Sequence, residues 1–174
     1  MHDERGFDTW YRGQHRRLVA AMAAIAGDVT VGAEVADEAF VRAFERWDRV
    51  ATMASPEGWL YRTALNQLRR TQRRGALEQR LLRRTSTRPS ERVAGNVSDW
   101  QPDTLRAIAA LPNRQRHAVA LHYVADLSVA DTALLMGIAP GTVMATLHAA
   151  RASLSRSLGE DLPADSTPGG PSHG

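Results

Sequence analysis

The stretch from Leu111 to Arg156 decides the fold of this chain, and it reads LPNRQRHAVALHYVADLSVADTALLMGIAPGTVMATLHAARASLSR. Its spacing predicts three short amphipathic helices, of which the last two are joined by a tight turn at Met136-Gly137-Ile138. Ser128 is a suitable N-cap for the second helix, with an acid three residues later. Gly137 stands where a residue with positive φ ends a helix, and Pro140 suits the first turn of the next one.

Apolar residues recur at helical spacing in both of the last two helices. The first of them carries Ala130, Ala133, Leu134 and Leu135, and the second carries Val143, Leu147, Ala150 and Leu154. A helix, a glycine-containing turn and a second helix form the helix-turn-helix motif, whose second helix enters the major groove of DNA. The same pattern also occurs in all-helical proteins that never touch DNA. The motif alone therefore leaves both interpretations open.

The composition excludes several classes of site. The chain has 174 residues, enough for one or two small domains with a core. All 22 basic residues are arginines, whose planar fork of donors suits phosphates and guanine edges, although the net charge is only +3. The absence of cysteine excludes disulfides, thiolate catalysis and cysteine-ligated zinc. No apolar run approaches membrane-spanning length and Met1–Arg5 is unlike a signal peptide, so we expect a cytoplasmic protein without membrane contact.

Two helices are predicted in the N-terminal part, over residues 7–25 and 34–50. The second has the clearest pattern in the chain, an apolar stripe formed by Ala36, Ala39, Phe40, Ala43, Phe44 and Trp47. Its other face is charged and carries Glu34, Asp37, Glu38, Arg42, Glu45, Arg46 and Asp48. Such a mixed-charge face is either simply solvated or a docking face for another helix.

A third helix is predicted to start at Ser55-Pro56-Glu57, which supplies a cap, a proline in the first turn and an acid near the positive end. The chain then becomes strongly basic, with Arg62, Arg69, Arg70, Arg73, Arg74, Arg80, Arg83 and Arg84 beside a single acid, Glu78. Arginines near Trp59 and Tyr61 are suited to a nucleic-acid backbone and to unpaired bases. The alternative is a solvated helix end, which the negative C-terminal dipole also favours.

The pattern predicts an all-α protein of two small helical domains, at residues 7–84 and 101–158. Residues 85–100 are rich in Ser, Thr, Pro, Gly and Asn and are expected to form a flexible linker, and residues 159–174 a disordered tail. The sequence has no glycine-rich phosphate loop, no serine elbow and no histidine pair at metal spacing. We therefore expect neither an enzyme nor a cofactor or metal site.

The stretches AEVADEAFVRAFERWDRV, PEGWLYRTALNQLRR and LPNRQRHAVALHYVADLSVADTALLMGIAPGTV together resemble a bacterial RNA polymerase sigma factor of the extracytoplasmic-function (ECF) group. The resemblance covers residues 7–158, and it implies a protein that binds core RNA polymerase and promoter DNA. It implies docking of the second helix on the β′ clamp helices through Glu34, Asp37, Glu38, Arg42, Glu45 and Arg46, around an apolar ridge with Phe40 and Phe44.

The same resemblance implies two DNA-binding sets. The third helix opens the promoter −10 element with Trp59, Tyr61, Arg62, Asn66, Arg69, Arg70 and Arg73. The helix-turn-helix reads the −35 element and touches the β flap, with Ser128, Thr142, Met144, Thr146, His148 and Arg151 nearest the groove. The polymerase performs the chemistry, so no catalytic residue is implied.

Three departures from the family pattern matter, and two of them fall in the helix-turn-helix that reads the −35 element. Residues 141–146 read Gly-Thr-Val-Met-Ala-Thr where Gly-Thr-Val-Lys-Ser-Arg is common, and Ala149 stands where an arginine is common. Ala139 replaces a frequent capping serine. In the second helix, residues 35–37 read Val-Ala-Asp in place of Leu-Val-Gln. Each lost bidentate base contact removes about 1–3 kcal/mol of discrimination, so we expect weak or unusual −35 recognition.

Two alternatives remain beside a sigma factor. One is a free-standing helix-turn-helix regulator, although such a protein needs neither the arginine-rich third helix nor the docking-type second helix. The other is a sigma-like interaction module that has lost productive promoter recognition. Sigma factors of this group are usually held inactive by an anti-sigma factor, which the resemblance implies as a further partner.

Overall fold

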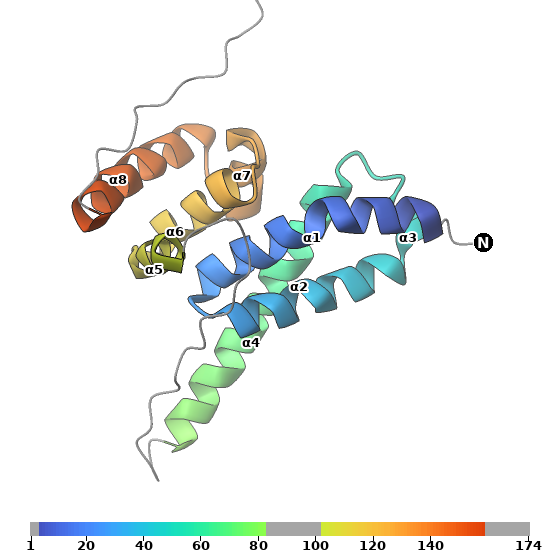
Figure 1. The fold of residues 1–174 in the computed structure, drawn as a ribbon, viewed down its shortest axis with the longest axis horizontal. Coiled ribbons are helices and arrows are strands. Elements are labelled where there is room, and N and C mark those ends of the chain that lie inside the picture. Colours follow the sequence, from blue (N-terminus) through green and yellow to red (C-terminus); the bar gives the residue numbers. More distant parts are fainter. Residues whose placement is uncertain (1–3, 83–101, 159–174) are drawn as a thin grey trace, which may run out of the picture.

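The computed structural model describes residues 4–82 and 102–158, and every element in these ranges is a helix (Figure 1). The elements are α1 (Glu4–Ala26), α2 (Val29–Phe44), α3 (Trp47–Val50), α4 (Pro56–Leu82), α5 (Pro102–Ala110), α6 (Asn113–Val119), the π-helical turn η1 (Ala120–Val124), α7 (Val129–Met136) and α8 (Pro140–Leu158). The predicted all-α fold with a C-terminal helix-turn-helix is confirmed. The expected linker, the expected tail, Arg83 and Arg84 lie outside the described residues.

Helices α1 and α2 form a tight hairpin. Gly27 has φ +70°, which ends α1, and the Asp28 carboxylate accepts a hydrogen bond from the Val31 amide at 3.0 Å. Because Asp28 caps α2, this helix begins at Val29 and not at Glu34 as predicted. The sequence pair Gly27-Asp28 therefore both ends one helix and starts the next.

The predicted helix over residues 34–50 is interrupted. Helix α2 ends at Phe44, and Arg46 adopts φ −123° and ψ 21° before the short helix α3 begins at Trp47. The interruption turns Trp47 inward, where its ring lies 5.3 Å from Phe7 and 5.0 Å from Trp10 between centroids. Burial of this large ring in an aromatic cluster favours the break over a continuous helix.

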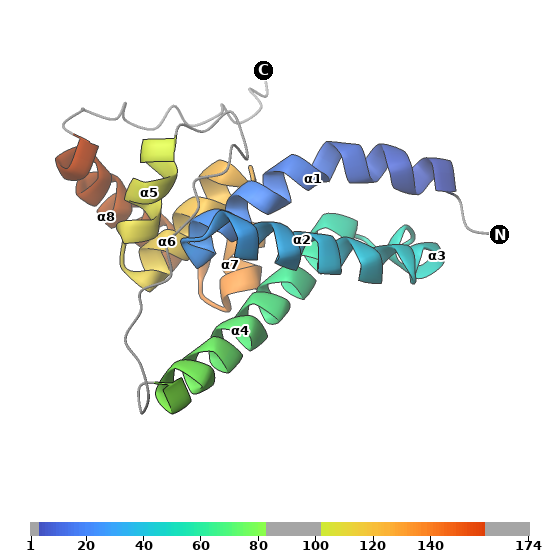
Figure 2. The ribbon, with the colours of Figure 1, turned by 60° about the horizontal axis from the view of Figure 1, so that its bottom comes forward.

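Helix α4 starts as predicted, because the Ser55 hydroxyl accepts a hydrogen bond from the Gly58 amide at 3.0 Å. One face of its first half is buried in the core and consists of Leu60, Tyr61, Ala64, Leu65 and Leu68. The C-terminal half extends beyond the other helices, as the second view makes plain (Figure 2).

The helix-turn-helix has the predicted local structure. Ser128 caps α7 by accepting from the Asp131 amide at 3.0 Å, and Gly137 ends it with φ +67°. The Ile138 amide donates to the Ala133 carbonyl at 3.1 Å, which is the long bond of a Schellman motif. The four predicted apolar positions of α8 are all buried: Val143, Leu147, Ala150 and Leu154.

The predicted apolar face of α7 is only partly correct. Ala133 is buried and Leu135 is half-buried, but Ala130 is exposed and Leu134 is 68% exposed. The buried neighbour is instead Thr132, which is fully enclosed. The helix is therefore rotated so that Leu134 faces away from the second domain's own core.

The two helical domains pack against each other. Helix α1 contacts α5, α6 and η1 as well as α2 and α4, and the buried apolar side chains of both domains form one continuous cluster. An Arg116 Nη1 group on α6 donates to the carbonyl of Ile25 on α1 at 3.1 Å.

Replacement of Tyr61 by phenylalanine is expected to stabilise the protein by about 1 kcal/mol. Tyr61 is 0% exposed, and its hydroxyl has no hydrogen-bond partner within the described residues. An unpaired buried hydroxyl costs about 1–3 kcal/mol, and removing it removes that penalty. Tyr123→Phe is the matched control, because the Tyr123 oxygen accepts from Arg151 at 2.9 Å and that variant should lose stability. Urea unfolding measures the free energy of unfolding of both variants. A loss of stability in Tyr61→Phe would show that the Tyr61 hydroxyl is not an unpaired buried group.

Candidate nucleic-acid interface

One face of α4 gathers the exposed polar residues predicted to bind the −10 element. Arg62, Asn66, Arg69 and Arg73 follow one another at three- and four-residue steps, Arg70 lies four residues after Asn66, and all five are exposed. Because side chains at this spacing share one side of a helix, the sequence-predicted residues are brought together along about three turns of α4.

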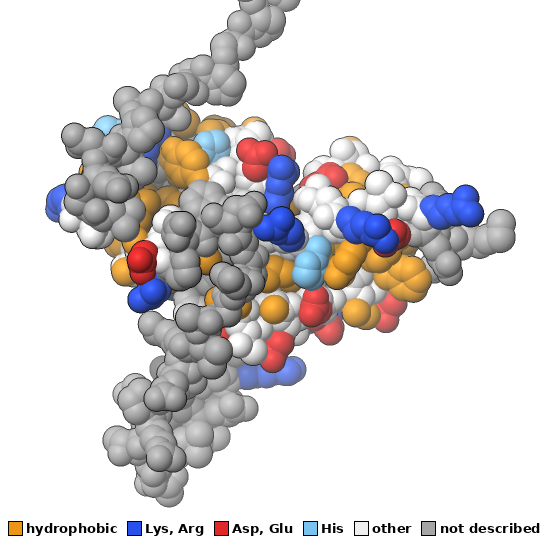
Figure 3. All heavy atoms as spheres, in the orientation of Figure 1, with side chains coloured by type: hydrophobic (Ala, Val, Ile, Leu, Met, Phe, Trp, Pro, Cys, Tyr) orange, Lys and Arg blue, Asp and Glu red, His pale blue; other side chains and the backbone are white. Residues whose placement is uncertain are grey.

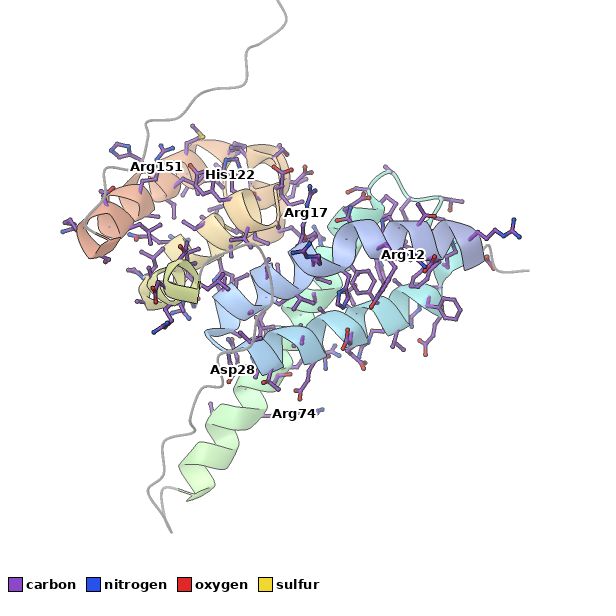
Figure 4. The ribbon with its side chains drawn as sticks, in the orientation of Figure 1. Arg12, Arg17, Asp28, Arg74, His122 and Arg151 are labelled. Atoms are coloured by element: carbon purple, nitrogen blue, oxygen red, sulfur yellow. The ribbon has the colours of Figure 1, made fainter. Side chains whose placement is uncertain are left out.

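The electrostatics of this face are uniformly positive. Residues 58–76 of α4 contain no Asp or Glu, and Arg69 donates a long hydrogen bond to the Asn66 side-chain oxygen at 3.4 Å. Arg74 is also exposed and projects from α4 into open space (Figure 4). A row of guanidinium groups on a projecting helix can neutralise successive phosphates of a nucleic-acid backbone.

Tyr61 does not belong to this face, and the prediction that it contacts unpaired bases is wrong for this structure. It is in phase with Ala64, Leu65 and Leu68, the buried side of α4. Burial raises the pKa of its hydroxyl, so Tyr61 acts as a neutral core residue. The spacing of Tyr61 relative to the apolar residues of α4 already indicated a buried position, whereas the spacing of Arg62 indicated an exposed one.

Trp59 and Arg62 line a cleft of about 490 Å³ between the start of α4 and helix α7. The α4 side contributes Ser55, Glu57 and Gly58 as well, and the other side consists of Asp126, Leu127, Ser128, Asp131, Leu134 and Leu135. Trp59 is half-buried there, and Trp10 Nε1 donates to the Glu57 carboxylate behind it at 3.1 Å. Its lining holds the carboxylates of Glu57, Asp126 and Asp131 against the Arg62 guanidinium, and with Arg17 3.7 Å from Asp126 the cleft has a small excess of negative charge.

Helix α8 presents Thr142, Met144 and His148 to the outside, and Met144 is 46% exposed. Two other predicted −35 contacts are engaged within the protein. The Thr146 hydroxyl donates to the Thr142 carbonyl at 2.7 Å, and Arg151 donates to the Tyr123 oxygen at 2.9 Å. Ser128 serves as the cap of α7. Because residues 140–149 contain no arginine and Arg151 is bonded to Tyr123, the outward side of the first half of α8 offers no guanidinium group.

The charged face of α2 is mostly accessible. Glu34, Asp37, Glu45 and Arg46 are exposed, whereas Glu38 and Arg42 pair with each other at 2.9 Å. Acidic side chains follow this helix along the edge of the molecule in Figure 3. Asp37 lies 3.2 Å from the His15 ring of α1.

The apolar ridge predicted on α2 consists of different residues. Phe40 is buried against Trp10 and Tyr11, with ring centroids 5.7 and 4.8 Å away, so it cannot contact a partner. Phe44 is 41% exposed, and sequence analysis missed Val41, which is 55% exposed. Val41 lies outside the apolar stripe of the sequence, which is why the pattern alone did not select it.

Helix α6 lies close to the arginine face. Burial is the main cause that lowers the pKa of His117. The contact of its Nδ1 with the Asn113 carbonyl at 2.8 Å opposes this shift, and the positive charges of Arg69 and Arg116 add to it. A neutral His117 avoids a further positive charge beside Arg69.

Within residues 4–82 and 102–158, no cluster of three His, Cys, Asp or Glu side chains has the arrangement of a metal site. In the same ranges, no single helix is long and apolar enough to cross a membrane. Helices α7 and α8 reach that length and composition only as a pair bent by 99°.

Comparison with known proteins agrees with this architecture. The family model of sigma-70 region 4 matches residues 103–154, which span α5 to most of α8. The ECF RNA polymerase sigma factor SigM of Mycobacterium tuberculosis is 33% identical over 167 residues, covering 90% of this chain and 79% of SigM. The RNA polymerase sigma-E factor of Streptomyces avermitilis is 27% identical over 154 residues, covering 87% of this chain and 84% of that protein.

Two solved structures share the fold. Sigma factor RpoE in complex with the anti-sigma factor NepR from Bartonella quintana gives a TM-score of 0.75 at 20% identity, covering 91% of this chain and 99% of that one. CnrH in complex with the cytosolic domain of CnrY gives 0.61 at 21% identity, covering 90% of each chain. With a relative above 30% identity along most of its length and a helix-turn-helix that matches the region 4 model, this chain belongs to the ECF family of RNA polymerase sigma factors.

Proposed function

We propose that this protein is a working sigma factor, which binds core RNA polymerase through α2, opens the −10 element with α4 and contacts the −35 element with α8. Its family membership supports the general role. The observation that carries the promoter-opening step is the row of exposed arginines on α4, Arg69, Arg70 and Arg73, on a segment without acidic residues.

The division of labour on α4 follows from chemistry. Arginines hold the phosphates of the separated strands, and Trp59 at the start of the helix offers a flat ring on which a flipped base can stack. Stacking on an aromatic ring is worth about 1–3 kcal/mol per base, which offsets part of the cost of unstacking. The polymerase supplies the catalytic residues, so this chain acts as a dissociable specificity subunit and not as an enzyme.

Core binding is assigned to the exposed part of α2. Val41 and Phe44 form a small apolar surface flanked by Glu34, Asp37 and Glu45. An apolar centre with a charged rim is the usual composition of a protein interface. We assign the contact with the β′ clamp helices to this surface, in which Val41 takes the place of the buried Phe40 among the predicted contact residues. We assign a contact with the β flap to the helix-turn-helix. We place the protein in the cytoplasm, where the polymerase acts.

Readout of the −35 element is expected to be weak. In the first half of α8, the outward side chains predicted to face the groove are Thr142, Met144 and His148, and none of them offers the bidentate fork that selects guanine. Scrambling the −35 sequence of a responsive promoter should therefore change transcription by less than about tenfold, which corresponds to at most one bidentate base contact. Run-off transcription on the native and scrambled templates measures this change. Met144→Arg is the companion variant, which should increase the ratio of transcript from the native template to transcript from the scrambled one. A loss above a hundredfold in the wild type would contradict weak readout.

The decisive experiment is run-off transcription with purified core polymerase, with and without this protein, on fragmented genomic DNA of the source bacterium. Discrete new transcripts establish the sigma function, and their upstream sequences identify the promoters. Co-purification with core in the absence of transcripts favours a sigma-like interaction module, an alternative that the absence of arginine from the first half of α8 supports. If the protein neither co-purified with core polymerase nor produced transcripts, the proposal would be overturned.

An anti-sigma factor is the partner we propose for regulation. RpoE and CnrH, the two structural neighbours, were both solved in complex with anti-sigma factors. The acidic cleft between α4 and α7, with Leu134 exposed beside it, is the surface we assign to that contact.

A further inference from the structure

Tyr123 is bonded to Arg151, one of the residues predicted to contact the −35 element, although the two lie 28 positions apart in the chain. Arg151 Nη1 donates to the Tyr123 hydroxyl oxygen at 2.9 Å, and both side chains are half-buried. The bond joins the π-helical turn η1 to the second half of α8. Figure 4 shows Arg151 on α8 and also labels His122, the neighbour of Tyr123 in η1. Tyr123 itself was not among the predicted DNA contacts.

The turn η1 holds the Tyr123 ring in place. At its end the Ala125 amide donates to the Ala120 carbonyl, five positions earlier, at 2.9 Å. Single π-helical turns of this kind occur frequently at functional sites. The His122 ring lies edge-on to Tyr123 with centroids 4.7 Å apart, and its Nδ1 contacts the Leu127 carbonyl at 2.8 Å. The hydroxyl that meets Arg151 is therefore presented by a ring with contacts of its own.

The contact holds the Arg151 guanidinium without cancelling its charge. The acceptor is a hydroxyl oxygen, whereas a carboxylate would carry a compensating negative charge. Neither η1 nor α8 contains an Asp or a Glu. A guanidinium has five N–H donors, so one bond to a phenol is compatible with a two-pronged contact to a phosphate. Tyr123 can thus orient the cation and leave its charge available for an anionic partner.

The position of Arg151 on α8 matches the edge of a DNA groove. Met144, His148 and Arg151 are separated by four and three residues, so they share one side of the helix, on which Met144 and His148 are exposed. Arg151 lies about 10 Å further along the axis than Met144, at 1.5 Å per residue. The major groove is about 12 Å wide. A helix that enters the groove with its first half therefore brings Arg151 to the phosphates that border the groove.

We propose that Tyr123 is a positioning residue for promoter binding, which orients Arg151 toward a DNA phosphate beside the −35 element. This inference rests on the proposed contact of α8 with that element. Phosphate contacts fix the register of a protein on DNA and carry no sequence information directly. Residues 140–150 contain no arginine, so a pre-oriented Arg151 supplies an electrostatic anchor to a helix that reads bases weakly. Orientation before binding also avoids the entropy cost of ordering a long side chain in the complex.

Run-off transcription at limiting sigma concentration tests the proposal with Tyr123→Phe, Arg151→Gln and the double variant. Arg151→Gln is expected to lower the transcript at least about tenfold, because a charge-assisted hydrogen bond to phosphate is lost. Tyr123→Phe should lower it about three- to tenfold, because Arg151 must then be ordered on binding. The double variant should be no worse than Arg151→Gln alone. Arg156→Gln, exposed on the same helix, removes the same charge as the matched control and should leave the transcript unchanged.

Salt dependence separates a positioning role from a structural one. Arg151→Gln should flatten the slope of log promoter affinity against log salt by about 0.9, the contribution of one phosphate contact on duplex DNA. Tyr123→Phe keeps the charge and should keep the slope. If Tyr123→Phe lowered transcription by the same factor in the wild type and in Arg151→Gln, its role would be structural and the proposal would be overturned. Wild-type or higher transcription by Tyr123→Phe would overturn it as well. These results presuppose wild-type transcripts, whose absence would instead overturn the sigma function on which the inference rests.

Discussion

Simultaneous replacement of Arg69, Arg70 and Arg73 by glutamine is expected to lower run-off transcription by about a thousandfold. The three side chains are exposed on one face of α4, so their loss leaves the core intact. A hydrogen bond to a charged group is worth about 1.5–3 kcal/mol, and three such losses multiply to at least this factor in affinity. The slope of log affinity against log salt should also flatten by about two, since each single-strand phosphate contact contributes about 0.7.

The matched control is a triple variant that removes the same charge elsewhere. Arg5, Arg12 and Arg114 are exposed and lie outside α4. Their replacement by glutamine changes the net charge equally and should reduce transcription by less than tenfold. If the α4 variant retained wild-type transcription and salt dependence, the assignment of the arginine face to DNA would be wrong.

The elements that sequence reasoning located correctly are those with local causes. Ser55 caps α4, Ser128 caps α7 and Gly137 ends α7, and each depends on residues within three or four positions. The apolar stripe of α8 was also correct, because helical periodicity fixes which side chains share a face. Local chemistry was sufficient for both kinds of feature.

The elements that it missed depend on contacts between distant residues. The break after Phe44 exists because Trp47 packs on Phe7 and Trp10, forty or so positions earlier, which no local pattern encodes. Phe40 was assigned to a partner surface although rings from α1 enclose it. In both cases tertiary packing decided the outcome.

Two other misses had a signal in the sequence. Tyr61 is in phase with the apolar residues of α4, so helical periodicity already separated it from Arg62. The run LVAAMAAI at residues 18–25 lacks any polar position, which indicates a helix with partners on two sides. Helical periodicity thus predicted which faces of α4 and α8 are exposed, and the sequence of α1 indicated a second packing partner without identifying it.

Gly32→Ala is expected to lower the free energy of unfolding by about 2 kcal/mol. In α2 the added Cβ atom would lie 2.4 Å from the nitrogen and 2.5 Å from the Cα atom of Ala23, and backbone atoms cannot rotate away as a side chain can. The two helices must therefore move apart, and overpacking of this kind costs about 1–3 kcal/mol. Because α1 is packed on both sides, the shift is transmitted to α5, α6 and η1. Urea unfolding followed by circular dichroism measures the loss.

Gly13→Ala in α1 and Gly75→Ala in α4 are the controls, since a Cβ atom at either position meets nothing within 4 Å. Both should gain up to about 1 kcal/mol, because alanine is the better helix former. The opposite signs separate a steric effect at the α1–α2 crossing from a general effect of glycine. Gly32→Leu should lose more than Gly32→Ala, since a larger side chain forces a wider separation. A Gly32→Ala variant as stable as the two controls would show that α1 and α2 do not approach this closely.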